Sequence, residues 1–200
     1  MELHEKVIRR LEDFILDDRQ LRSVGNLSFE HRGKQEIAYP YLRALNGPLV
    51  NAVGALIKRD GRAPDALRFL EVGCGIGTKC ELVRLLGVSA TGIDLLPEYV
   101  ELAKKVFAEC AFLHANALEF DYHGFDIVYY HAPFFDDHLI ESLESRVLSQ
   151  LPVGGVLIAT RISPAFAAVL DSNGTDRGDW MAERSTLEVD VGRLVVVKKS

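Results

Sequence analysis

From residue 67 onward, short apolar runs alternate with segments of helical periodicity, and this alternation limits the fold more than any other feature. Strands that alternate with helices at such spacing predict a parallel sheet covered by helices on both faces. The chain is therefore expected to be α/β, a three-layer α-β-α sandwich around a mostly parallel, seven-stranded sheet. The predicted strands are Leu67–Val72, Ala90–Ile93, Ala111–His114, Asp126–Tyr130 and Val156–Thr160, with helices at 78–86, 97–108 and 139–151 between them.

Both ends of the chain depart from this alternation. At the N-terminus an apolar helical stripe begins at Leu3, and it is equally consistent with core packing and with contact in a homodimer. Further helices are expected at 35–45 and 48–58, so residues 1–66 are interpreted as a helical extension or lid and residues 67–200 as the main domain. After a short helix at Pro164, the segments Ser185–Asp190 and Leu194–Lys198 predict a closing antiparallel hairpin.

Composition narrows the function classes. The 200 residues are 48% hydrophobic and carry a net charge of −6, which is ordinary for a folded globular protein. An acidic chain lacks the positive field that phosphate backbones require, so nucleic acid is an unfavoured partner. Three cysteines without framework spacing favour a reducing compartment. With no signal-peptide core and no membrane-length apolar run, a cytoplasmic location without membrane contact is predicted.

The most informative segment is the glycine-rich run from Phe69 to Gly77, in which Gly73, Gly75 and Gly77 occupy alternate positions. Glycines allow a tight turn at the end of a strand, and they leave no Cβ to hold a ligand away from the main chain. The helix that follows presents unpaired N–H groups at the same place. The carboxyl edge of a parallel sheet is where small ligands bind, so this loop predicts a binding site.

The spacing distinguishes between ligands. A dinucleotide-binding fingerprint places its third glycine at position 78, which here is Thr78, and Glu71 puts a carboxylate beside the loop. A carboxylate suits a cationic ligand better than a pyrophosphate. The segment resembles the first motif of the class I S-adenosylmethionine-dependent methyltransferases. That resemblance implies a Rossmann-like fold, S-adenosylmethionine as cofactor, S-adenosylhomocysteine as product, and cofactor contacts from Glu71, Gly73, Cys74, Gly75 and Gly77.

Two later segments fit the same resemblance. Asp94 ends the second predicted strand, where the family's acid accepts the ribose hydroxyls, and Leu95 would lie against the adenine. Asp94 is also placed to cap the next helix. Asn116 and Ala117 stand where the family meets the adenine edge, although the family usually has an acid at the first position. Asn116 retains a carbonyl oxygen that can accept a hydrogen bond, and a simple turn-forming role is the alternative.

The fourth predicted strand runs into His131, Ala132, Pro133 and Phe134, where the family places its acceptor-binding loop. Amino-group methyltransferases carry Asn or Asp followed by Pro-Pro and an aromatic residue. Only the proline and aromatic half is present, so methylation of amines or bases is not inferred. A turn at Leu151–Val156 resembles the family's Pro-Gly-Gly turn, with one valine inserted.

His131 is the candidate general base, because an imidazole titrates near working pH, and it is also counted among the cofactor contacts. The alternative is a ring that satisfies a backbone carbonyl. Pro133 and Phe134 are candidate substrate contacts, as is Tyr41 from the predicted lid, for which a core position is the alternative. No histidine has metal-ligand spacing, so no metal site is predicted.

These patterns together predict an S-adenosylmethionine-dependent methyltransferase acting on an unidentified acceptor, most plausibly a small molecule. Two other interpretations stay open. One is a catalytically weak S-adenosylmethionine-binding partner protein, and the other is a nucleotide-dependent oxidoreductase on a related sheet.

Overall fold

A computed structural model describes residues 46–171, 180–181, 188–189, 192–193 and 195–199 of the chain. The amphipathic stripe near the N-terminus, the predicted helix at 35–45 and the candidate substrate residue Tyr41 lie outside these ranges. The homodimer contact and the lid role assigned to the N-terminal extension therefore remain predictions.

Five parallel strands form the centre of the sheet, as predicted. They lie in the order β3-β2-β1-β4-β5, followed by β9 and β6, both of which run antiparallel to their neighbours. The strands are β1 (Arg68–Val72), β2 (Ser89–Asp94), β3 (Ala111–His114), β4 (Ile127–Tyr130), β5 (Val156–Ala159), β6 (Trp180–Met181) and β9 (Val195–Lys199).

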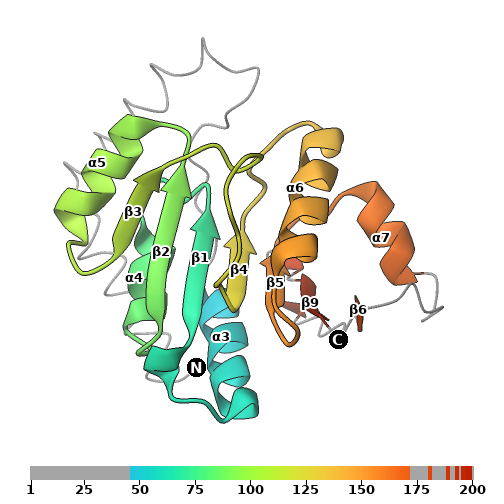
Figure 1. Cartoon of the computed structure of the whole chain (residues 1–200), viewed down its shortest axis with the longest axis horizontal. Helices are drawn as coiled ribbons and strands as arrows, with labels where there is room; N and C mark the ends of the chain where they lie inside the picture. The colour runs from blue at the N-terminus through green and yellow to red at the C-terminus, as the bar shows by residue number, and fades with distance from the viewer. Residues whose placement is uncertain (1–45, 172–179, 182–187, 190–191, 194, 200) are drawn as a thin grey trace.

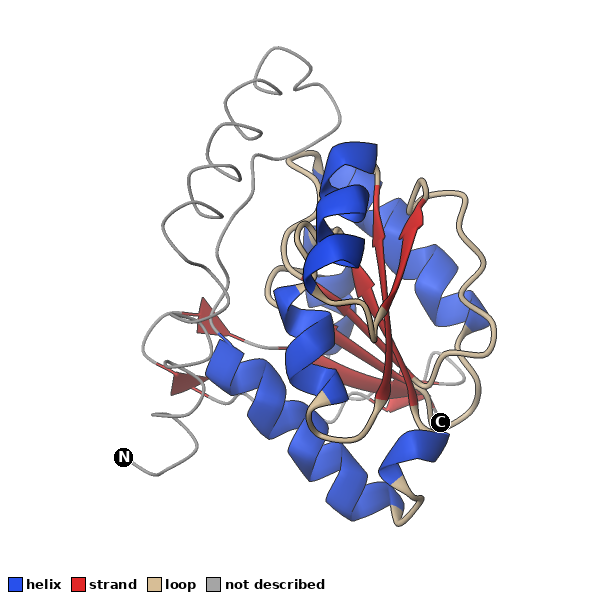
Figure 2. Cartoon of the chain, turned by 90° about the vertical axis from the view of Figure 1, so that its left-hand side faces the viewer, coloured by secondary structure: helices blue, strands red, loops and turns tan. Residues whose placement is uncertain are grey.

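Helices lie on both sides of this sheet (Figures 1 and 2). The described helices are α3 (Asn46–Asp60), the short 3-10 helix η2 (Pro64–Ala66), α4 (Thr78–Arg84), α5 (Pro97–Val106), α6 (Asp137–Gln150) and α7 (Pro164–Asp171). Their positions match the predicted helices, with ends shifted by a few residues. Helix α3 begins at Asn46, two residues before the predicted start at 48, and α6 begins after Asp136, whose side chain accepts a hydrogen bond from the His138 amide.

The predicted closing hairpin is wrong in its pairing. Strand β7 (Glu188–Val189) pairs with β8 (Gly192–Arg193) in a separate two-stranded ladder, whereas β9 pairs with β5 and β6. The sequence of β9 explains this placement, because three consecutive valines suit an interior strand better than the alternation of a half-exposed hairpin. Turn residues alone did not indicate which strands would pair with one another.

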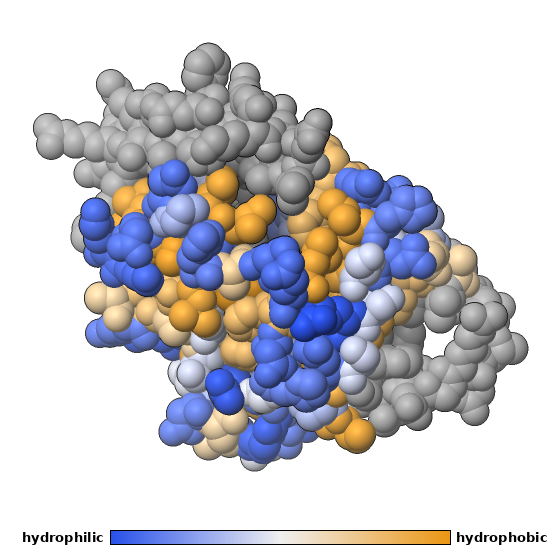
Figure 3. Space-filling model, turned by 45° about the horizontal axis from the view of Figure 1, so that its top comes forward, coloured by the Kyte–Doolittle hydropathy of each residue, from blue (hydrophilic) through white to orange (hydrophobic). Residues whose placement is uncertain are grey.

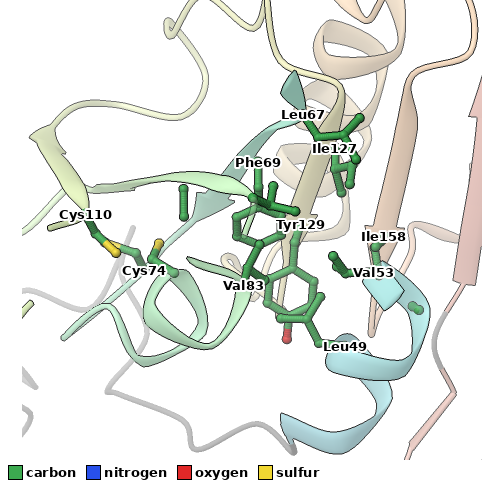
Figure 4. Packing of buried hydrophobic residues seen from close by; sticks show 14 of the residues in the cluster. Leu49, Val53, Leu67, Phe69, Cys74, Val83, Cys110, Ile127, Tyr129 and Ile158 are labelled. Atoms are coloured by element: carbon green, nitrogen blue, oxygen red, sulfur yellow. The ribbon is translucent and has the colours of Figure 1, made fainter. Parts of the chain in front are cut away.

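Side chains alternate between the two faces of the strands, and this separates the core into two layers. On one face Phe69 of β1 stacks on Tyr129 of β4, with ring centroids 6.3 Å apart. Figure 4 shows this pair with Leu49 and Val53 of α3 and Val83 of α4 around it. Helix α3 is therefore part of the main core, although the sequence assigned it to an N-terminal extension.

The opposite face is covered by α6 and contains a buried polar network. Glu144 of α6 is only 2% exposed, and its carboxylate accepts hydrogen bonds from the Tyr130 hydroxyl at 2.7 Å and the Ser163 amide at 3.0 Å. The Ser163 hydroxyl donates to the second carboxylate oxygen. Burial raises the pKa of Glu144 above its ordinary value of 4.5, although the hydrogen bonds partly oppose this shift. The network links β4, α6 and the segment after β5.

The turn from β1 into α4 depends on Gly77, which has a φ of +83°. A Cβ at this position would lie 2.4 Å from ring atoms of Phe112 in β3. Both the backbone conformation and the available space therefore require glycine here.

Gly77→Ala is expected to destabilise the protein by more than about 2 kcal/mol, because a strained φ and a clash with a buried ring act together. Gly54→Ala in α3 is the matched control, since a Cβ there meets nothing within 4 Å. This control should stabilise the helix by about 0.5–1 kcal/mol. Urea unfolding of both variants measures the difference, and equal midpoints would contradict the description of the turn.

Glu144→Gln is expected to change how stability depends on pH. The folded-state pKa of Glu144 is raised, so its contribution is fully present below the ordinary carboxyl pKa and is lost as pH rises through the folded-state value. The free energy of unfolding of the wild type should therefore fall relative to Glu144→Gln between about pH 4 and neutrality. Glu109→Gln, at a side chain that is 73% exposed, is the control. A constant difference between wild type and Glu144→Gln would refute the assignment.

Candidate functional site

The strand order reverses between β1 and β4, and in open α/β sheets ligands bind in the crevice outside the carboxyl ends of the strands at such a point. From β1 the chain continues to β2 and β3 on one side of the sheet, and from β4 it continues to β5 on the other side. The chain therefore leaves β1 and β4 in opposite directions. A Cβ built on Gly73 would lie 3.7 Å from the Cβ of Pro133, which shows that the two predicted loops meet here. The predicted glycine loop and the predicted acceptor loop are thus in contact at Gly73 and Pro133.

The glycine loop is held by main-chain hydrogen bonds to the end of β2. The amides of Gly73 and Cys74 both donate to the carbonyl of Ile93 at 2.9 Å, and the Gly77 amide donates back to Cys74. Gly73, Gly75 and Gly77 all have positive φ, between +52° and +83°. Gly73 is exposed, and the rest of the loop is buried. The loop therefore presents bare backbone at one point of an otherwise packed turn.

Asp94 connects this loop to the next element. One carboxylate oxygen accepts the Gly75 amide at 2.8 Å, and the other accepts the Leu96 amide at 2.9 Å. Desolvation raises the pKa of Asp94, and the backbone hydrogen bonds oppose that shift. Asp94 therefore bonds the amide of Leu96, the residue before α5, but no side chain caps this helix, and the contact of Asp94 with the glycine loop was not indicated by the sequence.

Glu71 lies beneath the loop and is 6% exposed. Its carboxylate accepts a hydrogen bond from the Cys80 thiol at 3.3 Å, and the charge of the equally buried Lys79 acts on it. Burial raises the pKa of Glu71 above its ordinary value, and Lys79 lowers it. The Lys79 ammonium also contacts the side-chain oxygen of Asn46 in α3. Glu71 therefore faces α4 and the core, not an open surface.

The cysteines of this region are buried thiols. Desolvation, together with the nearby carboxylates, raises the pKa of both Cys74 and Cys80 well above the ordinary value. A thiol with a raised pKa is rarely ionised to the thiolate and is therefore a poor nucleophile. Cys74 thus contributes its small size and its backbone to the loop, and its thiol is unreactive.

The residues expected near an adenine lie after β2 and β3. Leu95 is 36% exposed beside Asp94. The Asn116 side-chain oxygen accepts the Leu118 amide at 3.0 Å, and its nitrogen donates to Glu119 at 3.1 Å. The turn-forming role is therefore observed for Asn116. The carbonyl of Ala117, which also stands in this turn, accepts a hydrogen bond from the Tyr122 hydroxyl at 2.7 Å.

His131 follows β4 directly and is half-buried. Its Nδ1 lies 2.6 Å from the Thr160 hydroxyl oxygen at the end of β5, so the ring bonds a side chain and not the backbone carbonyl considered from the sequence. Burial lowers the pKa of His131, and the Lys79 charge lowers it further. Ala132, the next residue, has a φ of +42°, a strained value for a residue with a side chain.

The rest of the predicted acceptor loop is anchored. Phe134 is buried and Phe135 is 60% exposed. The Arg161 guanidinium donates to the carbonyls of both residues at 3.3 Å and pairs with Asp137. This arginine, together with Thr160, was not indicated by any sequence motif.

Within the described residues, no three potential ligands of the His, Cys, Asp and Glu types lie close enough together to hold a metal ion. A search of the same residues finds no helix with the length and apolar character needed to cross a bilayer.

Comparisons with known proteins match this arrangement. Residues 69–155 match the model of a methyltransferase domain family. The chain is 37% identical over 75 residues to the ubiquinone biosynthesis O-methyltransferase of Brucella ovis, and a Brucella abortus protein of that name gives the same values. This match covers 35% of the chain and 27% of each relative, so the chain spans only about a quarter of their length.

Solved structures share the fold. An RNA methyltransferase from Salinibacter ruber, crystallised with S-adenosylhomocysteine, aligns with a TM-score of 0.56 at 17% identity over 77% of this chain and 92% of that one. The magnesium protoporphyrin IX methyltransferase of Synechocystis, with bound S-adenosylmethionine, gives 0.57 at 16% identity over 92% and 98%. Residues 69–155 thus match a methyltransferase domain family, and the chain shares the Rossmann-like fold of these S-adenosylmethionine-dependent methyltransferases.

Proposed function

We propose that this chain transfers a methyl group from S-adenosylmethionine to a hydroxyl group of a small molecule. The observation that carries the proposal is that the glycine loop, which Asp94 anchors, lies against Pro133 in the loop that begins with the half-buried His131. The loop and acid suit the cofactor, and the histidine suits an acceptor that must lose a proton.

The residues at the crevice fit S-adenosylmethionine. Gly73 is exposed at the point where a side chain would obstruct a ligand. Asp94 accepts backbone amides on both oxygens, with a further amide from Leu95, and a carboxylate offers about four lone pairs, so a ribose hydroxyl can still be accepted. The buried Thr78 hydroxyl, next to the loop, has no hydrogen-bond partner among the described residues. Gly73, Gly75, Asp94 and Leu95 are the proposed cofactor contacts, with Asn116 and Ala117 at the adenine edge.

The electrostatics of the loop favour a cationic ligand. Burial raises the pKa of both Glu71 and Asp94, and the charge of Asp94 raises the pKa of Glu71 further. A positive ligand beside Asp94 would relieve that penalty. When bound, S-adenosylmethionine supplies a methyl group on a positively charged sulfur, which leaves as a neutral thioether. Glu71 is proposed to act from beneath the loop, through its charge and its contact with α4.

His131 is proposed to accept the proton of the acceptor hydroxyl. Its lowered pKa keeps the imidazole neutral at physiological pH, and only the neutral form can act as a base. Pro133 and Phe134 would shape the acceptor site beside it. Alignment of the acceptor by these groups supplies much of the rate enhancement expected for a displacement reaction.

Two observations favour a small hydroxylated acceptor. The curated relatives are named as O-methyltransferases, and the acceptor loop lacks the Asn or Asp of amine methyltransferases. An RNA acceptor, suggested by the name of one structural relative, fits less well with a net charge of −6. The described face in Figure 3 mixes hydrophobic and hydrophilic residues, as small-molecule sites often do.

Asp94→Ala is expected to weaken S-adenosylhomocysteine binding at least about tenfold, because each hydrogen bond to a charged acceptor contributes about 1.5–3 kcal/mol. Isothermal titration calorimetry measures this, with Asp65→Ala on the exposed η2 helix as the control. Circular dichroism confirms that both variants fold. Unchanged affinity in a folded Asp94→Ala protein would sink the proposed cofactor site, and binding without any turnover would favour a catalytically weak partner protein.

His131→Gln is expected to lower kcat by about 10²- to 10⁴-fold and to leave S-adenosylhomocysteine affinity nearly unchanged. The assay follows S-adenosylhomocysteine formation with a panel of catechols, phenols and matched anilines. Wild-type activity should rise with pH through a midpoint below 6.5, the ordinary histidine value, because the pKa of His131 is lowered. Turnover of anilines but not phenols would contradict the hydroxyl acceptor, and an unaltered kcat in His131→Gln would contradict the base.

A further inference from the structure

The residues that follow β4 and β5 lie side by side. Tyr130 and Ala159 are register partners in these parallel strands, so His131 and Thr160 come next to each other where the strands end. The Thr160 amide also donates to the Tyr130 carbonyl at 3.4 Å. The contact between His131 Nδ1 and the Thr160 hydroxyl, at 2.6 Å, therefore joins two side chains whose backbones the sheet already fixes.

The segment that carries Thr160 is anchored on its far side as well. Ser163 is 1% exposed, and both its amide and its hydroxyl donate to the buried Glu144. Arg161 holds the carbonyls of Phe134 and Phe135. Thr160 thus sits between two fixed points, which is the condition for orienting another side chain with little loss of entropy.

The other ring nitrogen of His131 has a different environment. Within residues 46–171, Nε2 makes no hydrogen bond. A neutral imidazole carries one N–H and one lone pair. An N–H left without an acceptor in a half-buried site is less favourable than an unused lone pair. The geometry therefore favours the proton on Nδ1, donated to Thr160, and the lone pair on Nε2.

We propose that Thr160 is a positioning residue that accepts a hydrogen bond from Nδ1–H of His131 and thereby makes Nε2 the proton acceptor of the reaction. This rests on the proposed function. As the acceptor oxygen forms its bond to the methyl carbon, the bond from that carbon to sulfur breaks and its electron pair stays on sulfur. The hydroxyl proton moves to Nε2, and the resulting imidazolium keeps its Nδ1–H bond to Thr160.

Lys79 assists from the other face. It is the charged side chain that acts on His131 from α4, and both its positive charge and burial keep the ring neutral. Thr160 then selects which nitrogen holds the single proton. The two residues divide the task, since one sets the protonation state and the other sets the tautomer.

Nitrogen-15 NMR of the histidine side chains tests this proposal and is recorded on the full chain without ligand. The signals of His131 are identified as those that are lost in His131→Gln. At neutral pH the wild type should show a protonated Nδ1 and an unprotonated Nε2. Thr160→Val should shift His131 toward the other tautomer, and Thr160→Ser, which retains the hydroxyl, should restore the wild-type pattern. With an acceptor from the panel, Thr160→Val should lower kcat at least about tenfold with unchanged cofactor affinity.

A proton on Nε2 in the wild type, or the same tautomer in Thr160→Val, would overturn the proposal. These spectra are recorded without turnover, so they stand apart from the activity measurements. If the spectra match the expectation and His131→Gln keeps full activity, the role of His131 as base fails together with this inference, whereas the Asp94 cofactor site is unaffected.

Discussion

The carboxylate of Asp94 is the interaction on which the site depends. Its two oxygens hold amides from two different elements, the loop after β1 and the approach to α5. Without it, the Gly75 amide would lose its acceptor in a buried turn, and only the amides of Gly73 and Cys74 would still join the loop to β2, through the Ile93 carbonyl. Burial raises the pKa of Asp94, so the group is held in a state that a nearby positive charge stabilises. The side chain that fixes the loop geometry is therefore also the one that we propose favours a cationic ligand.

The central sheet was predictable because its signals are local. The central strands β4 and β5 are short apolar runs that are buried throughout, and each helix shows its own periodicity. Gly77 could be assigned to a turn from its type alone, and the structure adds the reason, a ring of Phe112 in the space of a Cβ. Asp94 could also be placed at the carboxyl edge of the sheet, because the hydrophobic pattern of the sequence indicated where β2 ends.

The polar partners were not predictable, because they join residues far apart in the chain. His131 and Thr160 are 29 positions apart, and Lys79 and Asn46 are 33 apart. A lysine after a glycine loop is typical of a solvated helix, and nothing in its neighbours reveals that it is buried. The orientation of Glu71 was not predictable for the same reason. Glu71 lies two residues after Phe69 and shares its face of β1, but the sequence does not show that this face is the one toward α4.

We propose that the carboxyl edge of β1, β2 and β4 binds S-adenosylmethionine, and amide NMR can follow such binding residue by residue. Titration with S-adenosylhomocysteine should shift the amides of residues 73–77, 94–96 and 116–118. A second hollow, lined by Arg62, Asp126 and Val153 at the opposite edge of the sheet, is an internal reference that should stay unchanged. Shifts confined to that second hollow, or no shifts at saturating ligand, would contradict the account.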